Sequence, residues 1–300
     1  MKILLFGKNG QVGWELQRSL APLGEVIALD RDSTAYCGDF TDLVGLAKTV
    51  QAVGPDVIVN AAAHTAVDQA ESEPELARTL NALAPGVLAQ AAQSVGAWML
   101  HYSTDYVFDG SGSRAWCEAD GVAPVSVYGQ TKLEGEQLIQ LHCTQHLIFR
   151  TSWVYAARGA NFAKTMLRLA KERETLSVID DQFGAPTGAE LLADASAHAL
   201  RLVLHREHSR ADLAGLYHLS ASGTTTWHGY ARFVLQTALD AGVELRVKPQ
   251  DVVAVPSGSY PTAARRPLNS RLDCARLKTA FGLTLPPWQQ GVLRMLSETL

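Results

Sequence analysis

Residues 2–13 have the sequence KILLFGKNGQVG, in which a short apolar run leads into three glycines. The apolar run has the length and continuity of a strand buried in a sheet. Apolar residues then recur at helical spacing from Gln11 to Leu23. A strand, a tight turn and a helix in this order predict the first unit of a nucleotide-binding fold.

The same alternation continues through the first half of the chain. Strands with helices between them form parallel sheets through right-handed crossovers, and ligands bind at the carboxyl ends of such strands. The sequence therefore predicts an α/β fold with a doubly wound parallel sheet, a Rossmann domain. Strands are expected at residues 26–29, 56–59, 98–102 and 147–151, and helices at residues 43–53, 75–95 and 131–141.

After residue 152 the pattern loosens. Helices are expected at residues 162–172, 189–204 and 227–241, between loops rich in Gly, Pro, Ser and Thr. We predict an NAD(P)-binding Rossmann domain at residues 1–152 and a smaller mixed α/β domain at 153–300 that mainly binds substrate. Part of residues 189–220, in particular 215–219, is expected to return to the first domain.

Composition narrows the class of function. The 300 residues carry a net charge of -4 without a lysine run, which argues against nucleic-acid and anionic-membrane partners. The four cysteines form no C-x-x-C pair, so neither a zinc site nor a disulfide framework is expected. No signal peptide core and no run of roughly 20 apolar residues is present. We expect a cytoplasmic protein that acts on a small molecule.

The glycine-rich turn is the expected cofactor site. Its second glycine lies one residue later than in the usual G-x-G-x-x-G pattern, but the turn has the required place between strand and helix. Residues without a Cβ let the backbone approach a pyrophosphate, which the helix N-terminus then stabilises. The residues expected to contact the cofactor here are Gly7, Gly10, Gln11, Val12 and Gly13.

Two adjacent residues after the second strand point to different cofactors. The carboxylate of Asp30 would accept hydrogen bonds from ribose hydroxyls and favour NADH. The guanidinium of Arg31 would suit the 2'-phosphate of NADPH. The sequence leaves both cofactors open.

Two further pairs lie near the expected cofactor. Asp39 and Phe40 are placed to bracket an adenine, although an aspartate ahead of a helix is equally a simple cap. Ala62 and Ala63 follow the third strand and are small enough for a cofactor to lie across them, or for a helix to pack tightly there.

The expected chemistry rests on Tyr128 and Lys132, which lie one helical turn apart. An ammonium beside a phenol should lower the phenol pKa towards neutrality, so that tyrosine exchanges a proton with a carbonyl oxygen. The hydroxyl of Thr104 could hold the same oxygen. Tyr and Lys at this spacing also form ordinary surface pairs in many helices. His64 and His101, near strand ends, are alternative proton donors or plain structural residues.

These motifs resemble the extended short-chain dehydrogenase/reductase family over essentially the whole chain. Further motifs resemble its branch that reduces nucleotide sugars. The superfamily motifs are residues 7–13, 60–63 and 128–132, and the branch motifs are residues 103–110 (STDYVFDG), 150–155 (RTSWVY), 161–162 (NF), 181–187 (DQFGAPT) and 266–270 (RPLNS).

The resemblance implies NAD(P)H-dependent reduction of the C4 ketone of dTDP-4-dehydro-L-rhamnose to dTDP-L-rhamnose. Tyr128 would then donate the proton, Lys132 would hold the nicotinamide ribose, and Thr104 would orient the carbonyl. The resemblance also implies a homodimer and a divalent cation such as Mg²⁺, but no compact carboxylate cluster in the sequence locates a metal site. The resemblance implies that the sugar pocket involves Asp105, Trp153 and Asn161.

A substrate pyrophosphate calls for a cation in the second half of the chain. Arg266, after Arg265 and before Pro267, is the expected ligand, because a guanidinium matches phosphate oxygens. Surface arginines in a Pro-rich loop are the plain alternative.

Two other functions share these features. A nucleotide-sugar epimerase or dehydratase of the same superfamily would keep the Tyr/Lys pair, but dehydratases usually carry an Asp-Glu pair after the threonine, and here Tyr106 follows Asp105. A non-catalytic NAD(P)-binding regulatory subunit would keep the fold alone, and the intact Thr104, Tyr128 and Lys132 argue against it.

Overall fold

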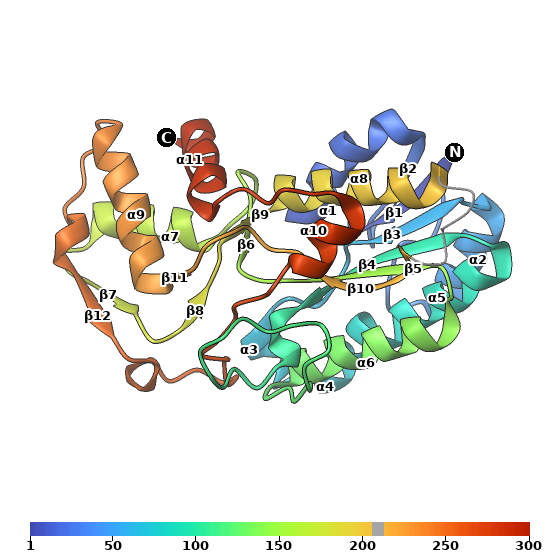
Figure 1. The fold of residues 1–300 in the computed structure, drawn as a ribbon, viewed down its shortest axis with the longest axis horizontal. Helices are drawn as coiled ribbons and strands as arrows, with labels where there is room; N and C mark the ends of the chain where they lie inside the picture. Colours follow the sequence, from blue (N-terminus) through green and yellow to red (C-terminus); the bar gives the residue numbers. More distant parts are fainter. Residues whose placement is uncertain (206–212) are drawn as a thin grey trace.

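The computed structural model describes residues 1–205 and 213–300, and within them six parallel strands form one central sheet (Figure 1). Their order is β10-β5-β4-β3-β1-β2, so the chain reverses direction across the sheet between β1 and β3. The predicted fold class is confirmed. The strands are β1 (Lys2–Phe6), β2 (Glu25–Leu29), β3 (Val57–Asn60), β4 (Trp98–Thr104), β5 (His146–Thr151) and β10 (Gly215–His218).

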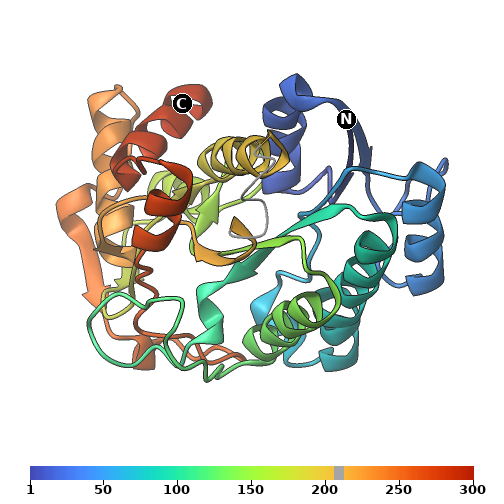
Figure 2. The ribbon, with the colours of Figure 1, turned by 45° about the vertical axis from the view of Figure 1, so that its right-hand side comes forward.

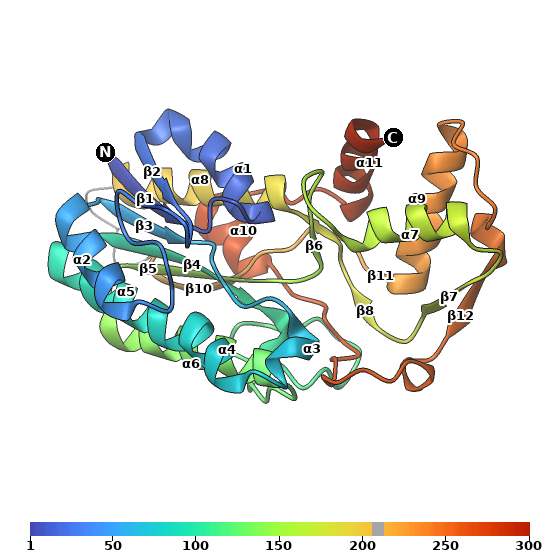
Figure 3. The ribbon, with the colours of Figure 1, turned by 180° about the vertical axis from the view of Figure 1, so that it is seen from behind.

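Helices cover both faces of the sheet because alternate strand residues point to opposite sides. Ile3 and Leu5 of β1 join the apolar cluster under α1, α8 and α10, whereas Leu4 and Phe6 join the cluster under α2, α5 and α6. Figures 1 and 3 show these two helical layers above and below the sheet. Their bounds are α1 (Gln11–Leu20), α2 (Leu43–Val53), α5 (Ala84–Val95), α6 (Val127–His142), α8 (Ala189–His205) and α10 (Ala275–Phe281).

The single helix expected at residues 75–95 is broken into three parts. Pro85 has no N–H for the ladder of a continuous helix, and the turn before it widens into a π-helix, η2 (Thr79–Leu83). A Cβ on Gly135 of α6 would collide with the carbonyl oxygen of Asn81 in this π-helix. The widened turn therefore packs backbone to backbone against α6. The preceding short helices are α3 (Val67–Ala70) and α4 (Pro74–Arg78).

The smaller lobe has its own core, formed by α7 (Phe162–Glu172), α9 (Trp227–Asp240) and α11 (Trp288–Thr299). Figure 2 shows α11, with the C-terminus, in this lobe. In the described part of the chain, paired short strands complete it: β6 (Val154–Tyr155) with β9 (Thr187–Gly188), β7 (Leu176–Ile179) with β12 (Val252–Val255), and β8 (Phe183–Gly184) with β11 (Thr225–Thr226).

The chain crosses between the lobes more than once. Strand β10 pairs with β5 in the central sheet, and Leu277 and Phe281 of α10 pack in the core of the larger lobe. Residues 206–212 of the segment expected to return lie outside the described residues. The division at residues 152/153 remains our proposal. Short 3₁₀ turns complete the fold: η1 (Ala21–Leu23), η3 (Asp105–Val107), η5 (Pro249–Asp251) and η6 (Ser257–Ser259).

Helix α6 is fastened to the sheet by a buried ion pair. Arg150 of β5 donates to Glu136 of α6 through Nε at 2.9 Å and Nη2 at 2.6 Å, and the two side chains are 5% and 2% exposed. The guanidinium carbon also lies 5.1 Å from the ring centre of Phe108. Removing either side chain would leave the other charge buried without a partner, because water does not reach this pair.

The substitution Glu136→Gln should lower the free energy of unfolding by about 3–5 kcal/mol, because it leaves the Arg150 charge buried and uncompensated. Urea unfolding followed by circular dichroism measures this. The matched control is Glu172→Gln, whose partner Arg168 and own side chain are 60% and 55% exposed; it should cost less than about 1 kcal/mol. Equal losses in both variants would contradict the assigned role of the buried pair.

Candidate active site

Two cavities lie near the predicted site: the smaller at the carboxyl ends of β1, β2 and β3, where strand order reverses, and the larger between the segment that follows β4 and the smaller lobe. The smaller has a volume of about 380 Å³ and lies beside the glycine-rich turn. The larger has a volume of about 1080 Å³ and lies between the smaller lobe and the segment that follows β12. Thr104, Tyr128 and Lys132 sit at the ends of β4 and the start of α6.

The smaller cavity brings together most of the predicted cofactor residues. Gln11, Val12 and Gly13 do not line it; they form the first turn of α1, and the Gln11 side chain donates instead to the Ala160 carbonyl at 2.8 Å. The predicted residues that line the cavity are Gly7, Gly10, Asp30, Arg31, Asp39, Phe40, Ala62 and Ala63.

A different structural constraint applies at each of the three glycines. Gly7 has φ +88°, and a Cβ there would lie 2.7 Å from the Ala62 nitrogen. A Cβ on Gly13 would collide with the Gly7 carbonyl oxygen. Gly10 caps α1 without a side-chain hydrogen bond, and its Cβ would meet only the Gly7 oxygen at 3.3 Å. The turn thus leaves an open helix N-terminus beside the cavity, which fits a dinucleotide pyrophosphate.

Asp30 is held by polar neighbours, whereas Arg31 is exposed to solvent and its Nε lies 3.8 Å from the carboxylate of Asp32. The carboxylate of Asp30 accepts from the hydroxyl of Ser33 at 2.7 Å and from the amide of Asn9, and Lys8 lies 3.5 Å away. Ser33 and Lys8 lower the pKa of Asp30. The Arg31 side chain is 81% exposed.

The alternatives left open at Asp39 and Phe40 are both compatible with their positions. Asp39 accepts from the backbone and hydroxyl of Thr41 at 2.9 and 2.8 Å, and thus caps the turn. Phe40 is buried edge-to-face against Phe6, with ring centres 5.6 Å apart. Both residues still line the smaller cavity.

Tyr128 lies in the first turn of α6. The helix begins at Val127, four residues earlier than expected, because Ser126 caps it by accepting from Gly129 at 3.2 Å. The edge of the Tyr128 ring meets Tyr106, with ring centres 5.6 Å apart. Burial raises the pKa of Tyr128 to about 12, although a hydrogen bond with Thr104 opposes the shift.

The expected lowering of the Tyr128 pKa by Lys132 is wrong for this structure. The Lys132 side chain is 2% exposed, and its amine donates to the Tyr102 carbonyl at 2.6 Å and lies 3.1 Å from Nε2 of His101. Burial lowers the pKa of Lys132 itself to about 8. The low-polarity surroundings that the two side chains share favour the neutral form of each.

Asp105 is a buried carboxyl beside Thr104. The Thr104 hydroxyl donates to its Oδ1 at 3.1 Å, and the side chain is 2% exposed. Burial raises its pKa to about 7, and hydrogen bonds from Ser270 and Thr104 offset this only in part. Asp105 can therefore change charge near neutral pH.

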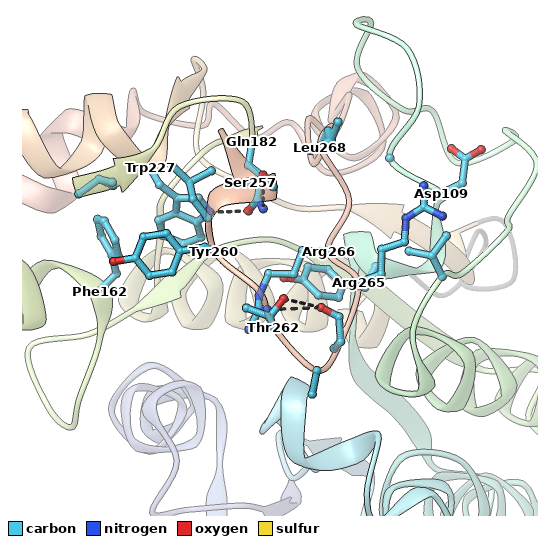
Figure 4. A pocket seen from close by; sticks show the side chains of 18 of the residues that line it. Asp109, Phe162, Gln182, Trp227, Ser257, Tyr260, Thr262, Arg265, Arg266 and Leu268 are labelled. Carbon is cyan, nitrogen blue, oxygen red and sulfur yellow. Dashed lines mark hydrogen bonds between the residues drawn. The ribbon is translucent and has the colours of Figure 1, made fainter. Parts of the chain in front are cut away.

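The larger cavity has an aromatic side and a cationic side, as Figure 4 shows. Phe162, Trp227 and Tyr260 lie on one side, and Arg265 and Arg266 on the other. Such a cavity offers stacking surfaces for a base or sugar and guanidinium groups for phosphate.

Among the predicted substrate residues, Arg266 is the one that lines this cavity; Thr104, Asp105, Trp153 and Asn161 do not. Arg266 lines it, but its guanidinium also binds the carboxylate of Asp68 at 2.6 and 3.2 Å. Trp153 stacks on Trp227 with ring centres 3.7 Å apart, and it takes the rare φ of +49°. A Cβ on Gly184 would lie 2.7 Å from the Trp153 ring, so glycine makes room for the stack.

Asn161 has a structural function in this arrangement. It caps α7 by accepting from Lys164 at 3.0 Å, and its amide donates to the Ala156 carbonyl at 2.7 Å. Its contact with substrate remains a prediction, as does that of Asp105, since neither lines the larger cavity.

Sequence reasoning missed several residues of the larger cavity. Trp227 begins α9 after three threonines, and its indole N–H donates to Gln182 at 3.1 Å. Tyr260 lies in a loop without regular pattern. Their only signal is an aromatic residue in a polar stretch, which does not indicate where the side chain will lie. Asp68, the partner of Arg266, gave no signal because 198 residues separate the two.

The described residues, 1–205 and 213–300, contain no group of three or more His, Cys, Asp or Glu side chains that could hold a metal ion. The cation implied by the resemblance therefore has no donor set there. Within the same residues, no helix has both the length and the apolar content that a membrane crossing needs.

A Rossmann sheet with a glycine-lined cavity, a buried threonine and lysine and a half-buried tyrosine defines an enzyme of short-chain dehydrogenase/reductase type. The family model described as RmlD substrate binding domain matches residues 1–300. The chain belongs to this family.

Individual relatives agree along their full length. The chain is 62% identical to a dTDP-4-dehydrorhamnose reductase of Escherichia coli K12 over 298 residues, 99% of this chain and 98% of that protein. It is similar to the crystal structure of a dTDP-4-dehydrorhamnose reductase from Clostridium acetobutylicum, with TM-score 0.86, 35% identity and 99% of each chain covered. A reductase of the same name from Bacillus anthracis, in complex with NADP, gives TM-score 0.86 and 34% identity, again with 99% of each chain covered.

The raised pKa of Asp105 predicts a pH-dependent stability. The folded state prefers the neutral carboxyl, so its contribution is present below about pH 4 and is lost as pH rises to about 7. Relative to Asp105→Asn, the wild-type free energy of unfolding should fall by roughly 2–4 kcal/mol across that interval. Urea unfolding at a series of pH values measures the difference.

Asp109→Asn is the control, because hydrogen bonds from Ser111 lower the pKa of Asp109 rather than raise it. The free energy of unfolding of the wild type, measured relative to Asp109→Asn, should not fall between pH 4 and 7. A flat curve for Asp105→Asn would show that the Asp105 carboxyl titrates normally.

Proposed function

We propose that this protein reduces the C4 ketone of dTDP-4-dehydro-L-rhamnose to dTDP-L-rhamnose with NADPH or NADH. The observation that carries the proposal is that Thr104 at the end of β4 lies beside Tyr128 in the first turn of α6, with Lys132 one turn later, in a chain 62% identical to a named reductase. The smaller cavity would hold the cofactor and the larger one the nucleotide sugar.

The site residues suit a reduction that ends in an alkoxide. The reduced nicotinamide supplies hydride when bound. The Thr104 hydroxyl lies beside Tyr128 and lowers its pKa, so both hydroxyls can meet one carbonyl oxygen. With a pKa of about 12, the phenol is fully protonated at neutral pH and is a loaded acid for an alkoxide, which is a stronger base.

The larger cavity supports a nucleoside diphosphate sugar as substrate. Phe162, Trp227 and Tyr260 give flat apolar surfaces for the base, and Arg265 and Arg266 give cations for the pyrophosphate. Since Arg266 already binds Asp68, a pyrophosphate must compete with that carboxylate or share the guanidinium with it. A homodimer in the cytoplasm completes the proposal, on the family resemblance.

The test follows reduced cofactor at its absorbance band with dTDP-4-dehydro-L-rhamnose present. One NAD(P)H should disappear for each sugar reduced. An epimerase or dehydratase would turn over sugar without net loss of NAD(P)H, because it recycles a bound NAD, and a regulatory subunit would neither turn over sugar nor consume cofactor.

Tyr128→Phe should lower turnover by about a hundredfold or more, since it removes the acid, while cofactor affinity stays near wild type. Full turnover in this variant would rule out Tyr128 as the donor.

The exposed Arg31 predicts how the cofactor is chosen. Arg31→Ala should raise the Michaelis constant for NADPH by about tenfold, because a charge-assisted contact to the 2'-phosphate is lost, and should leave that for NADH within about twofold. Steady-state kinetics with both cofactors give the ratio. Arg173→Ala, an exposed arginine after α7 in the smaller lobe, is the control and should change neither constant. Equal losses with both cofactors would contradict a 2'-phosphate contact.

A further inference from the structure

Asp68 of α3 fixes one wall of the larger cavity. The segment that follows β12 runs from the smaller lobe to α3, as Figures 1 and 3 show. The Oδ1 atom of Asp68 accepts from the backbone N–H of Ala264 at 3.0 Å and from Nη1 of Arg266 at 3.2 Å, and its Oδ2 accepts from Nη2 of Arg266 at 2.6 Å. Ala264 and Arg266 both line the cavity. One carboxylate thus holds this part of the wall at three points.

The guanidinium of Arg266 has a second edge for an anion. A guanidinium presents one pair of N–H donors at Nη1 and Nη2 and another pair at Nε and Nη2, and each pair matches two oxygens of a carboxylate or phosphate. Asp68 occupies the first pair, and Nη1 also lies 3.5 Å from the Ala264 carbonyl oxygen. The edge formed by Nε and Nη2 takes part in none of these contacts. A phosphate can therefore bind Arg266 while the ion pair with Asp68 stays intact.

The charges around Arg266 favour sharing over displacement. The Arg266 guanidinium lowers the pKa of Asp68, so the carboxylate is ionised at neutral pH. If a diphosphate took Arg266 away, this carboxylate would remain close to the phosphates and would repel them. While Asp68 and Arg266 stay paired, their charges cancel, and the exposed Arg265 on the same wall supplies a further positive charge.

Helix α3 is also attached to the helix that carries Tyr128. Glu71, the residue that ends α3, accepts from the backbone N–H of Val127 at 2.9 Å, and Val127 is the first residue of α6. Asp68 and Glu71 lie three positions apart, about one helical turn. A single turn of helix therefore sets the position of the arginine for the diphosphate relative to the tyrosine for the ketone, although the arginine follows a strand of the smaller lobe.

We propose that Asp68 is a positioning residue for the substrate: it holds Arg266 and the backbone of Ala264 at the cavity wall, so that the guanidinium binds the diphosphate through its Nε and Nη2 edge. The inference rests on the proposed function, because it takes a nucleoside diphosphate sugar as the ligand of the larger cavity. It goes further in stating that the phosphate shares the guanidinium with Asp68 and does not displace the carboxylate.

The first experiment measures the binding of dTDP and of thymidine to Asp68→Asn by titration calorimetry, with NADP⁺ present. The new amide oxygen can still accept from Ala264, but the amide nitrogen opposes the guanidinium donors, so Arg266 loses its fixed position. The dissociation constant for dTDP should rise about tenfold, and that for thymidine should stay within about twofold, because thymidine has no phosphate. If Asp68 were a competitor, the variant would bind dTDP more tightly. Tighter or unchanged dTDP binding would overturn the proposal.

The second experiment is a double-mutant cycle that tests whether Asp68 acts through Arg266. In the Arg266→Ala background, Asp68→Asn should change the dissociation constant for dTDP by less than about twofold, because no guanidinium remains to be positioned. A loss in this background as large as that in the wild type would show that Asp68 acts on the loop alone, and it would refute the proposal. Since Asp68 is 46% exposed, its replacement leaves no buried charge.

Asp120→Asn is the matched control, because Asp120 binds its partners in the same pattern. It accepts from the backbone N–H of Cys117 at 2.7 Å and from Nη1 and Nη2 of Arg114 at 2.8 and 2.7 Å. Neither Asp120 nor Arg114 lines the larger cavity. The dissociation constant for dTDP should stay within about twofold of wild type. An equal loss in this variant would assign the effect to the removal of any such ion pair and would contradict the proposal.

The same measurements separate this inference from the proposed reaction. If the protein binds dTDP in the expected pattern but does not reduce dTDP-4-dehydro-L-rhamnose, the role of Asp68 stands and the proposed reaction fails. If the protein reduces the sugar but Asp68→Asn binds dTDP as well as wild type does, the reaction stands and the role of Asp68 is refuted.

Discussion

The geometry of the site depends on how helix α6 is held against the central sheet. Its inner face carries a lysine and a glutamate into a region that water does not reach, and each needs a partner on a neighbouring strand. Lys132 binds the Tyr102 carbonyl of β4, and Glu136 binds Arg150 of β5. Apolar packing alone would allow the helix to rotate or slide, whereas these directional contacts fix it. The position of Tyr128, one turn before Lys132, follows from them.

The fold could be predicted because its pattern repeats. Alternation of apolar runs with helical spacing indicated the strands and helices of the larger lobe, and α2 and α7 begin and end at the expected residues. The break before Pro85 was not predicted, because the apolar residues keep their helical spacing on both sides of this proline. In the smaller lobe, two-residue strands such as β6 and β9 have no period to detect. Their pairing depends on tertiary packing between segments that are distant in the sequence.

The candidate site was predictable in its residues but less so in its electrostatics. Glycines and the Tyr/Lys pair carry local signals, and the structure gathers most predicted cofactor residues around one cavity. The partners of these residues come from distant segments: Asp68 for Arg266, Trp227 for Trp153, and His101 for Lys132. The direction of the Tyr128 pKa was mispredicted for the same reason. Helical spacing shows that two side chains are neighbours, but it does not show that burial outweighs their mutual effect.

The buried titratable groups beside Thr104 have one property in common. Burial raises the pKa of Tyr128 and Asp105 and lowers that of Lys132, so each group is displaced towards its uncharged form. An alkoxide that forms in such surroundings is poorly solvated, which makes it a stronger base than in water. A neutral phenol within hydrogen-bond reach then gives up its proton readily, although the same phenol is a very weak acid in the resting site. Proton transfer moves the negative charge from the sugar oxygen to the Tyr128 phenolate, and the transfer is favourable because the phenolate is the weaker base of the two anions.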